Sequence, residues 1–323
     1  MPSPDDFDAI FDTRIAPALA QLEDERKAVV KGFRMRGAPI SVLFAASAAA
    51  GAWVLSSDVM LAGFALLFSG VVAFAIAFQP LQRTANRAKE RALGAILQPL
   101  GVSFTISGFV TPDWEGVRRW GLAPGYDRSS FEDLFVGVRK GCAFALYEAH
   151  LEKETRDKDG DRSYHTVFRG QILSLAYPKL FTGAVIVRRD GGIFNAFSSP
   201  GSGFERVGVA DPEFERAFEI WGTDQVMARH VVDLLVLERL LELERAMKGA
   251  RLRCAFADGK VLIALEGKDK FEAGSMFTSL LDRERARRIF TDVASVFALI
   301  DVFVERDQAA ARISAGTAGL TAT

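Results

Sequence analysis

Residues Gly51 to Phe64 read GAWVLSSDVMLAGF, and this stretch decides how the N-terminal part of the chain folds. It lies within an almost uninterrupted apolar segment, residues 38–78. As one α-helix the segment would be about 60 Å long, roughly twice the ~30 Å thickness of the hydrocarbon core of a bilayer. Two helices of about 20 residues each would fit. The Ser-Ser-Asp triplet at 56–58 then forms a turn between two spans, at residues 38–55 and 59–78.

The charges around this segment predict its orientation. Asp58 is the only ionisable residue between Arg36 and Arg83; at mid-membrane it would cost roughly 2.5–3.5 kcal/mol, whereas at a turn it can reach water. Lysine and arginine flank the segment on both sides and are absent from the turn. The positive-inside rule therefore predicts a two-pass hairpin in the cytoplasmic membrane with both termini in the cytoplasm. A helical hairpin buried in a soluble core is the alternative.

The residues around the turn predict how the hairpin packs and what flanks it. Small residues crowd the first span, so we expect the two helices to approach closely, with the bulkier side chains of the second span facing lipid. Apolar residues recur at helical spacing in residues 1–37 and again in residues 79–98, which predicts an amphipathic N-terminal helix and a stalk helix. These two helices could pair with each other, or each could pack on the globular domain; the pattern is compatible with both.

The rest of the chain predicts a cytoplasmic domain at residues 99–305, followed by a small, polar tail at 306–323 that we expect to be disordered. Strand and helix candidates are segregated along this domain rather than alternating. Segregation favours an α+β fold, with an antiparallel sheet and packed helices, over a doubly wound fold.

Two β-hairpins are predicted from Asp-Gly pairs, which favour type I′ turns. The first joins residues 142–153 to 165–177 through Asp159-Gly160, and the second joins 251–257 to 260–265 through Asp258-Gly259. The first turn sets a register with an apolar face and a polar face, as expected for a half-buried antiparallel pair. The apolar pairs are Tyr147–Ile172, Ala149–Gly170 and Leu151–Phe168, and the polar pairs are Glu148–Gln171 and His150–Arg169.

Three helical stretches follow the first hairpin. Asp211 followed by Pro212 is typical of a helix N-cap and first position, and we expect Phe214, Phe218 and Trp221 to share one helical face. A longer helix is predicted from Asp224 to about Lys248. The last helix is predicted from Asp282 to about Phe303. Its expected inward-facing residues are Ile289, Val293, Val296, Phe297 and Ile300.

Three stretches of the sequence resemble a known family. FRGQILSLAYPKLFTGAVIVRRD, DPEFERAFEIWGTDQVMARHVV and FADGKVLIALEGKDKFE are similar to the bacterial two-span proteins known as domain of unknown function 3137. The resemblance covers roughly Leu81 to Ile300 and implies a bacterial inner-membrane protein. The family often breaks its helix near Asp233 with a proline, which this chain lacks, so we expect that helix to run through. The family has no established catalytic residues to transfer.

The chain carries no recognisable catalytic motif. It has no phosphate-binding or dinucleotide-binding glycine loop, three scattered histidines, and two cysteines in unrelated contexts. We therefore predict no catalytic residue, no cofactor and no metal site. The net charge of -1 argues against a nucleic-acid partner. The best polar constellation is Asp211, Glu213, Asp224 and Arg229, which could perform acid–base chemistry or simply cap helices and form an ion pair.

A basic cluster opens the last predicted helix: Arg283, Arg285, Arg287 and Arg288. Such clusters attract anionic lipid or a partner, although a solvated helix end also explains them. Taken together, these features favour a non-enzymatic interaction or scaffold domain, anchored in the lipid bilayer and bound to a protein partner or to further copies of itself. The alternatives are a membrane-associated enzyme with a site near Asp211–Arg229, or a domain that senses anionic lipid.

Overall fold

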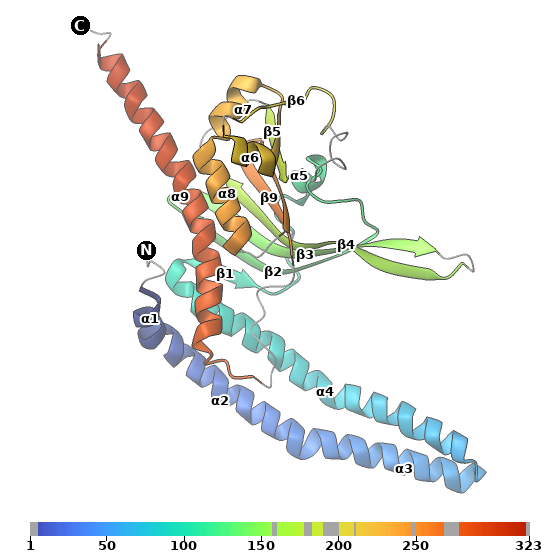
Figure 1. Cartoon of the computed structure of the whole chain (residues 1–323). Helices are drawn as coiled ribbons and strands as arrows, with labels where there is room; N and C mark the ends of the chain where they lie inside the picture. The colour runs from blue at the N-terminus through green and yellow to red at the C-terminus, as the bar shows by residue number, and fades with distance from the viewer. Residues whose placement is uncertain are drawn as a thin grey trace.

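Figure 1 shows the computed structural model, which describes residues 6–156, 160–177, 183–189, 200–209, 211–246, 250–267 and 278–320. Among these residues, nine strands form one antiparallel sheet, helices pack on it, and two long helices leave the domain together as a hairpin. This architecture confirms the predicted α+β class.

The N-terminal helices run without interruption as far as the predicted turn. They are α1 (Phe7–Ile10), α2 (Ala16–Gly32) and α3 (Ala38–Ser56), joined by two π-helical turns, η2 (Phe11–Ile15) and η3 (Phe33–Gly37). Ser57 then adopts the left-handed conformation, with φ 52°. Asp58 caps α4 (Val59–Leu97) by accepting the backbone N–H groups of Met60 and Leu61. The turn at 56–58 and the start of the second apolar helix are thus as predicted.

The second apolar helix extends well beyond the predicted span. α4 continues as one α-helix from Val59 to Leu97, so the stretch predicted as a stalk is its C-terminal part, and Pro80 does not end the helix. A short 3₁₀ turn, η4 (Gln98–Leu100), leads from α4 directly into the sheet.

The strand order in the sheet is β1-β2-β3-β4-β9-β8-β5-β7-β6, and neighbouring strands are antiparallel. The C-terminal hairpin, β8–β9, is therefore inserted between β4 and β5, which precede it in the chain. The strands are β1 (Val102–Thr105), β2 (Arg128–Arg139), β3 (Cys142–Arg156), β4 (Arg162–Ala176), β5 (Ala184–Arg189), β6 (Glu205–Arg206), β7 (Phe218–Gly222), β8 (Ala250–Ala257) and β9 (Lys260–Glu266).

Both predicted hairpins form. The β3–β4 register is the predicted one as far as Leu151, including Tyr147 opposite Ile172 and Glu148 opposite Gln171, and a bulge then shifts it by one residue toward the turn. Asp258 and Gly259 have φ of 53° and 70°, as a type I′ turn requires. Asp159, in the other predicted turn, lies outside the described residues. A third hairpin was not predicted: Lys140-Gly141, with φ of 47° and 84°, joins β2 to β3.

The expectation of one exposed sheet face is wrong for the centre of the sheet. Alternate residues of β3 enter two different cores. Phe144 and Leu146 face the helical layer, where the ring of Phe144 packs edge-on against Phe297 with centroids 5.6 Å apart. Tyr147 and its neighbours of the same parity face the side covered by α5 (Trp114–Arg119). Even Gln171, on the expected polar face, is 1% exposed.

Two predictions about the domain's helices are wrong. The helix capped by Asp211, α6 (Pro212–Ala217), ends before Phe218, so Phe218 and Trp221 lie in β7 instead of on a helical face. The helix expected to run through Asp233 is two helices, α7 (Gln225–Val231) and α8 (Leu234–Ala246). Asp233 caps the second by accepting the backbone N–H of Val236 at 3.0 Å. An N-cap aspartate thus starts α8, and the helix breaks here without a proline.

The last helix, α9 (Arg283–Leu320), packs along α8 and the sheet (Figure 1). All five residues predicted to face inward are buried. Its backbone remains helical beyond Asp307, after which the sequence predicted a disordered tail.

Candidate membrane anchor and polar sites

Large exposed apolar side chains cover the outside of α3 and of the first half of α4. Leu55 is 89% exposed, Val59 77% and Phe68 76%, and many others exceed one half. Soluble monomers rarely expose contiguous apolar patches larger than about 300–600 Å². By length and composition both helices could cross a membrane. The hairpin is therefore a candidate membrane anchor.

Small residues bring the two apolar helices together, as the sequence predicted. Ala45 of α3 is 8% exposed, and a Cβ added at Gly70 of α4 would lie 3.4 Å from the Cβ of Ala45. The hydroxyl of Ser41 donates to the carbonyl of Gly37 at 2.8 Å and reaches the carbonyl of Ala73, across the hairpin, at 3.3 Å. Close packing of this kind stabilises paired helices in lipid.

The N-terminal helix and the C-terminal part of α4 also pair with each other. The ring of Phe33 lies edge-on to Phe74 and Phe78, with centroid distances of 6.0 and 5.7 Å. Further from the turn, Arg91 lies 3.4 Å from the carboxylate of Glu25. Each helix contacts the domain as well, so both arrangements that the sequence left open occur together.

A buried carboxylate joins α2 to the segment that precedes α9. Glu23, 2% exposed, accepts hydrogen bonds from Nε and Nη2 of Arg26 at 2.9 and 2.7 Å and from the backbone N–H of Leu280 at 2.9 Å. The hydrogen bonds from Arg26 lower the pKa of Glu23 to about 2, with a further lowering by the Leu280 N–H, against the raising effect of burial. The N-terminal helix is thus held to the domain by a charged, desolvated contact.

A second ion pair joins α4 to the sheet. Nζ of Lys89 lies 2.6 Å from the carboxylate of Asp133, whose side chain is only 4% exposed. Asp133 occupies a bulge in β2, where the register with β3 shifts and φ is 56°. The bulge turns this carboxylate toward α4, so one helix of the apolar hairpin is tied to the domain's sheet.

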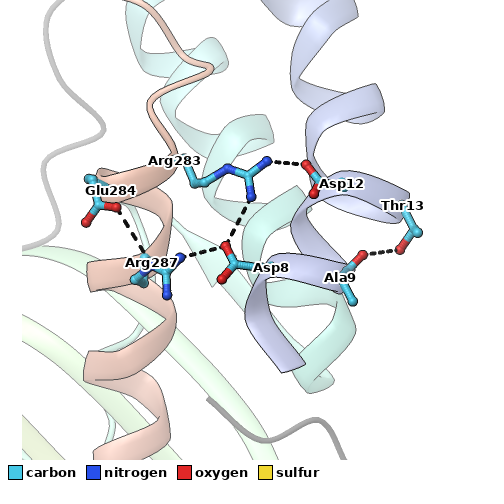
Figure 2. A network of polar contacts seen from close by, with 7 residues as sticks. All are labelled: Asp8, Ala9, Asp12, Thr13, Arg283, Glu284 and Arg287. Atoms are coloured by element: carbon cyan, nitrogen blue, oxygen red, sulfur yellow. Dashed lines mark hydrogen bonds and ion pairs between the residues drawn. The ribbon is translucent and has the colours of Figure 1, made fainter. Parts of the chain in front are cut away.

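The arginines that open α9 bind the N-terminal helix. Figure 2 shows Arg283 and Arg287 reaching Asp8, at 3.0 and 2.6 Å, while Arg283 also pairs with Asp12. The hydrogen bonds from Arg287, and then those from Arg283, lower the pKa of Asp8. The aromatic ring of Phe7 adds to this contact, because the guanidinium of Arg287 lies 5.0 Å from its centroid. Two of the four arginines predicted to meet lipid or a partner, Arg283 and Arg287, are therefore bound within the protein to the N-terminal helix.

The other two arginines of this cluster lie apart from that network. Arg285 pairs with Asp282, which precedes α9, at 3.1 Å and donates to the carbonyl of Ser279 at 3.0 Å. Arg288 is exposed. The four predicted residues do not converge on one surface site.

Two residues of the polar constellation predicted near α6 and α7 are helix caps. Asp211 accepts the backbone N–H of Phe214 at 3.4 Å, and Asp224 accepts the N–H of Val226 at 2.8 Å. Arg229 is exposed on α7, and the side chain of Glu213 lies outside the described residues. The geometry therefore accounts for the two aspartates as helix caps.

The structure brings together a polar network that sequence reasoning missed. Asp113, just before α5 and with φ of 52°, pairs with the ammonium of Lys260 and accepts the hydroxyl of Ser174 at 2.6 Å. Burial raises the pKa of Asp113, but the hydrogen bonds from Lys260 and Ser174 together outweigh burial and leave the pKa lowered. These residues lie far apart in the sequence, so no local spacing could have predicted the network.

Two cavities adjoin this network, of about 350 Å³ beside α5 and about 600 Å³ over the sheet. The two charged residues of the network, Asp113 and Lys260, already pair with each other. The network therefore serves as a structural contact that joins the start of α5 to β4 and β9. Within the described ranges, no group of three or more His, Cys, Asp or Glu side chains could hold a metal ion.

Comparisons with known proteins agree with the resemblance over part of the chain. The family model described as "Protein of unknown function (DUF3137)" matches residues 166–304, which runs from β4 into α9. The match begins well after Leu81, where the resemblance was expected to start. No curated protein matches the chain. Among solved structures, the mycobacterial trehalose monomycolate transport factor A, TtfA, is 12% identical, with a TM-score of 0.32, over 66% of this chain and 95% of that chain. A similarity this distant shows no shared fold or function.

Proposed function

We propose that the chain is anchored in the bacterial inner membrane by the α3–α4 hairpin, with both termini and the globular domain in the cytoplasm. The exposed apolar surface of the hairpin is the observation that carries this proposal. Leaving such side chains in water would cost roughly 1.5–3 kcal/mol for each large one. The distribution of charge supports the orientation, because the cations lie at the domain end and none lies in the turn.

Cysteine labelling in intact cells tests this topology. The natural cysteines, Cys142 and Cys254, are both buried. We therefore expect only an engineered surface cysteine to react with the label. Ser57→Cys, at the turn, is expected to react with a membrane-impermeant maleimide from outside the cytoplasmic membrane. The matched control, Ser163→Cys on β4, should react only after the membrane is permeabilised. Reaction of Ser163→Cys from outside, or recovery of the full chain in the detergent-free supernatant, would refute the proposal.

The cytoplasmic domain is proposed to act as an interaction or scaffold domain through an arm formed by β3 and β4. Pairing with β2 ends at Glu152 and pairing with β9 ends at Gly170. Beyond these residues the two strands continue to pair with each other as far as Arg156 and Arg162. Figure 1 shows the arm projecting from the body of the sheet. Projecting strands with open edges are suited to pairing with another chain.

Shortening the β3–β4 arm tests whether the domain binds another chain through it. Replacing residues 155–163 with Asn-Gly closes the hairpin after the Glu154–Tyr164 pair with a favoured two-residue turn. We expect the full chain, purified in detergent, to elute as a complex with a partner or with further copies, and the shortened chain to elute as a monomer. A full chain that is monomeric and without a partner contradicts the proposal, as does a shortened chain that keeps the complex.

A further inference from the structure

The larger of the two cavities beside Asp113 lies over one face of the sheet, across β2, β3 and β4. Its volume of about 600 Å³ falls within the range of roughly 300–1,000 Å³ that small-molecule sites occupy. The opposite face of these strands is closed, since Phe144 of β3 packs against Phe297 of α9 there. The face on the side of α5 is therefore the one that can receive a ligand.

Small and apolar side chains form the floor of this cavity. Val136 and Val138 of β2 are 36% and 57% exposed. Their partners on β3 are Ala145 and Ala143. Ala143 is exposed, as is Ala176 on β4. Removing such apolar surface from water favours association, so an aliphatic group fits this floor.

An ion pair forms the polar wall of the cavity. Asp113 binds the ammonium of Lys260 and accepts the hydroxyl of Ser174 at 2.6 Å. The side chains of Lys260 and Asp113 are 44% and 27% exposed, so the pair is within reach of a molecule in the cavity. An ammonium group has three N–H donors, and one of them serves Asp113. Lys260 can therefore donate to a ligand oxygen while it keeps its partner.

The charges at this wall select the head group of the ligand. Lys260 and Asp113 balance each other, and they are the only charged residues among the described residues that line the cavity. A carboxylate ligand would lie beside Asp113 and an ammonium ligand beside Lys260, and each would bring like charges together where water is partly excluded. An uncharged oxygen of an amide, ester or alcohol accepts a hydrogen bond from Lys260 without this cost.

We propose that the cavity over β2, β3 and β4 binds a small amphiphile, with its aliphatic part on the apolar floor and an uncharged oxygen accepting a hydrogen bond from Lys260. The network of Asp113, Lys260 and Ser174 then holds the start of α5 on the sheet and also presents a donor to the ligand. The inference depends neither on the membrane anchoring nor on the β3–β4 arm, because the cavity lies at the other end of these two strands.

Titration of the full chain in phosphatidylcholine nanodiscs tests the site, with empty nanodiscs as the blank for partition into lipid. Detergent is left out because its alkyl chains would compete for the cavity. The three probes share one alkyl chain length and differ in charge: octanamide, octanoate and octylammonium. Saturation-transfer NMR measures their dissociation constants. We expect octanamide to bind about tenfold more tightly than either charged probe.

Two substitutions test the floor and the wall separately. Ala143→Phe fills the cavity and should abolish binding of all three probes. The matched control Ser129→Phe, at an exposed position of β2 outside the cavity, should leave binding unchanged. Asp113→Asn keeps an acceptor for Ser174, and asparagine tolerates the φ of 52° at this position. It removes the negative charge that balances Lys260, so the preference should change from octanamide to octanoate.

Four results would overturn the inference. Equal binding of octanamide and a charged probe by the wild-type chain would show that charge does not select the head group. Binding that survives Ala143→Phe would place the probe elsewhere. A preference for octanamide that persists in Asp113→Asn would show that the head group does not lie at Lys260. Binding of no probe would show that the cavity does not take an aliphatic ligand.

Discussion

The substitution Glu23→Gln keeps the shape of a buried side chain and removes its charge. In the variant Arg26, which is 8% exposed, keeps its positive charge and loses the carboxylate of Glu23. The backbone N–H of Leu280 also loses a charged acceptor. Breaking a buried ion pair by removing one partner costs about 3–5 kcal/mol. We therefore expect the free energy of unfolding to fall by an amount of this size, and the hydrogen bond between Glu23 and the segment before α9 to weaken with it.

The pKa of Glu23 provides a second measure of the same contact. Hydrogen bonds from Arg26 and Leu280 lower this pKa from 4.5 to about 2, which corresponds to about 3 kcal/mol. Since the folded-state pKa is lowered, the stabilisation is fully present above about pH 5. It declines as the pH falls through 4.5 and is lost near pH 2. The variant lacks this carboxyl and should not show that part of the acid dependence.

Urea unfolding of the full chain in mild detergent, followed by tryptophan fluorescence, measures the effect. At pH 7 we expect the free energy of unfolding of Glu23→Gln to be about 3 kcal/mol lower than that of the wild type, and the difference to shrink as the pH approaches 3. Hydrogen exchange at the Leu280 amide should be roughly a hundredfold faster. Adding Arg26→Met should recover part of the loss, because it removes the buried positive charge that has lost the carboxylate of Glu23.

The control is Glu25→Gln, which removes an exposed carboxylate 3.4 Å from Arg91. Exposed pairs contribute little, so we expect a change within about 0.5 kcal/mol. The reasoning is refuted if Glu23→Gln is as stable as this control at pH 7, or if its deficit is the same at pH 3 as at pH 7.

Three further substitutions test contacts that build the domain. Lys89→Met removes the ammonium that pairs with the buried carboxylate of Asp133, and should lower the free energy of unfolding by about 3–5 kcal/mol in the same urea assay; a loss below 1 kcal/mol would contradict this. Gly170→Ala places a Cβ 1.9 Å from the carbonyl oxygen of Leu265. It should separate β4 from β9 and cost about 3 kcal/mol, with faster amide exchange in β9 as the check. Asp233→Ala removes the cap of α8 and should cost about 1 kcal/mol, whereas Asp233→Asn, which can still cap, should cost much less.

The sequence by itself determined the features that depend on neighbouring residues. The turn at 56–58 follows from the length of the apolar segment and from one aspartate within it. The register of β3 and β4 in the centre of the sheet follows from an alternating apolar pattern, and a bulge after Leu151 shifts the pairing by one residue toward the turn. The inward face of α9 follows from helical spacing. In each of these elements the deciding interactions lie within a few residues of chain or across one tight turn.

Only the tertiary structure decided which distant residues meet. The insertion of β8 and β9 between β4 and β5 depends on backbone hydrogen bonds between segments far apart in the sequence. The same holds for the pairing of Asp113 with Lys260, and of the α9 arginines with Asp8. An arginine has the same local pattern whether it faces solvent, lipid or a carboxylate of another helix. Its partner is selected by the packing of the whole chain, because ion pairing is set by distance in space and not along the sequence.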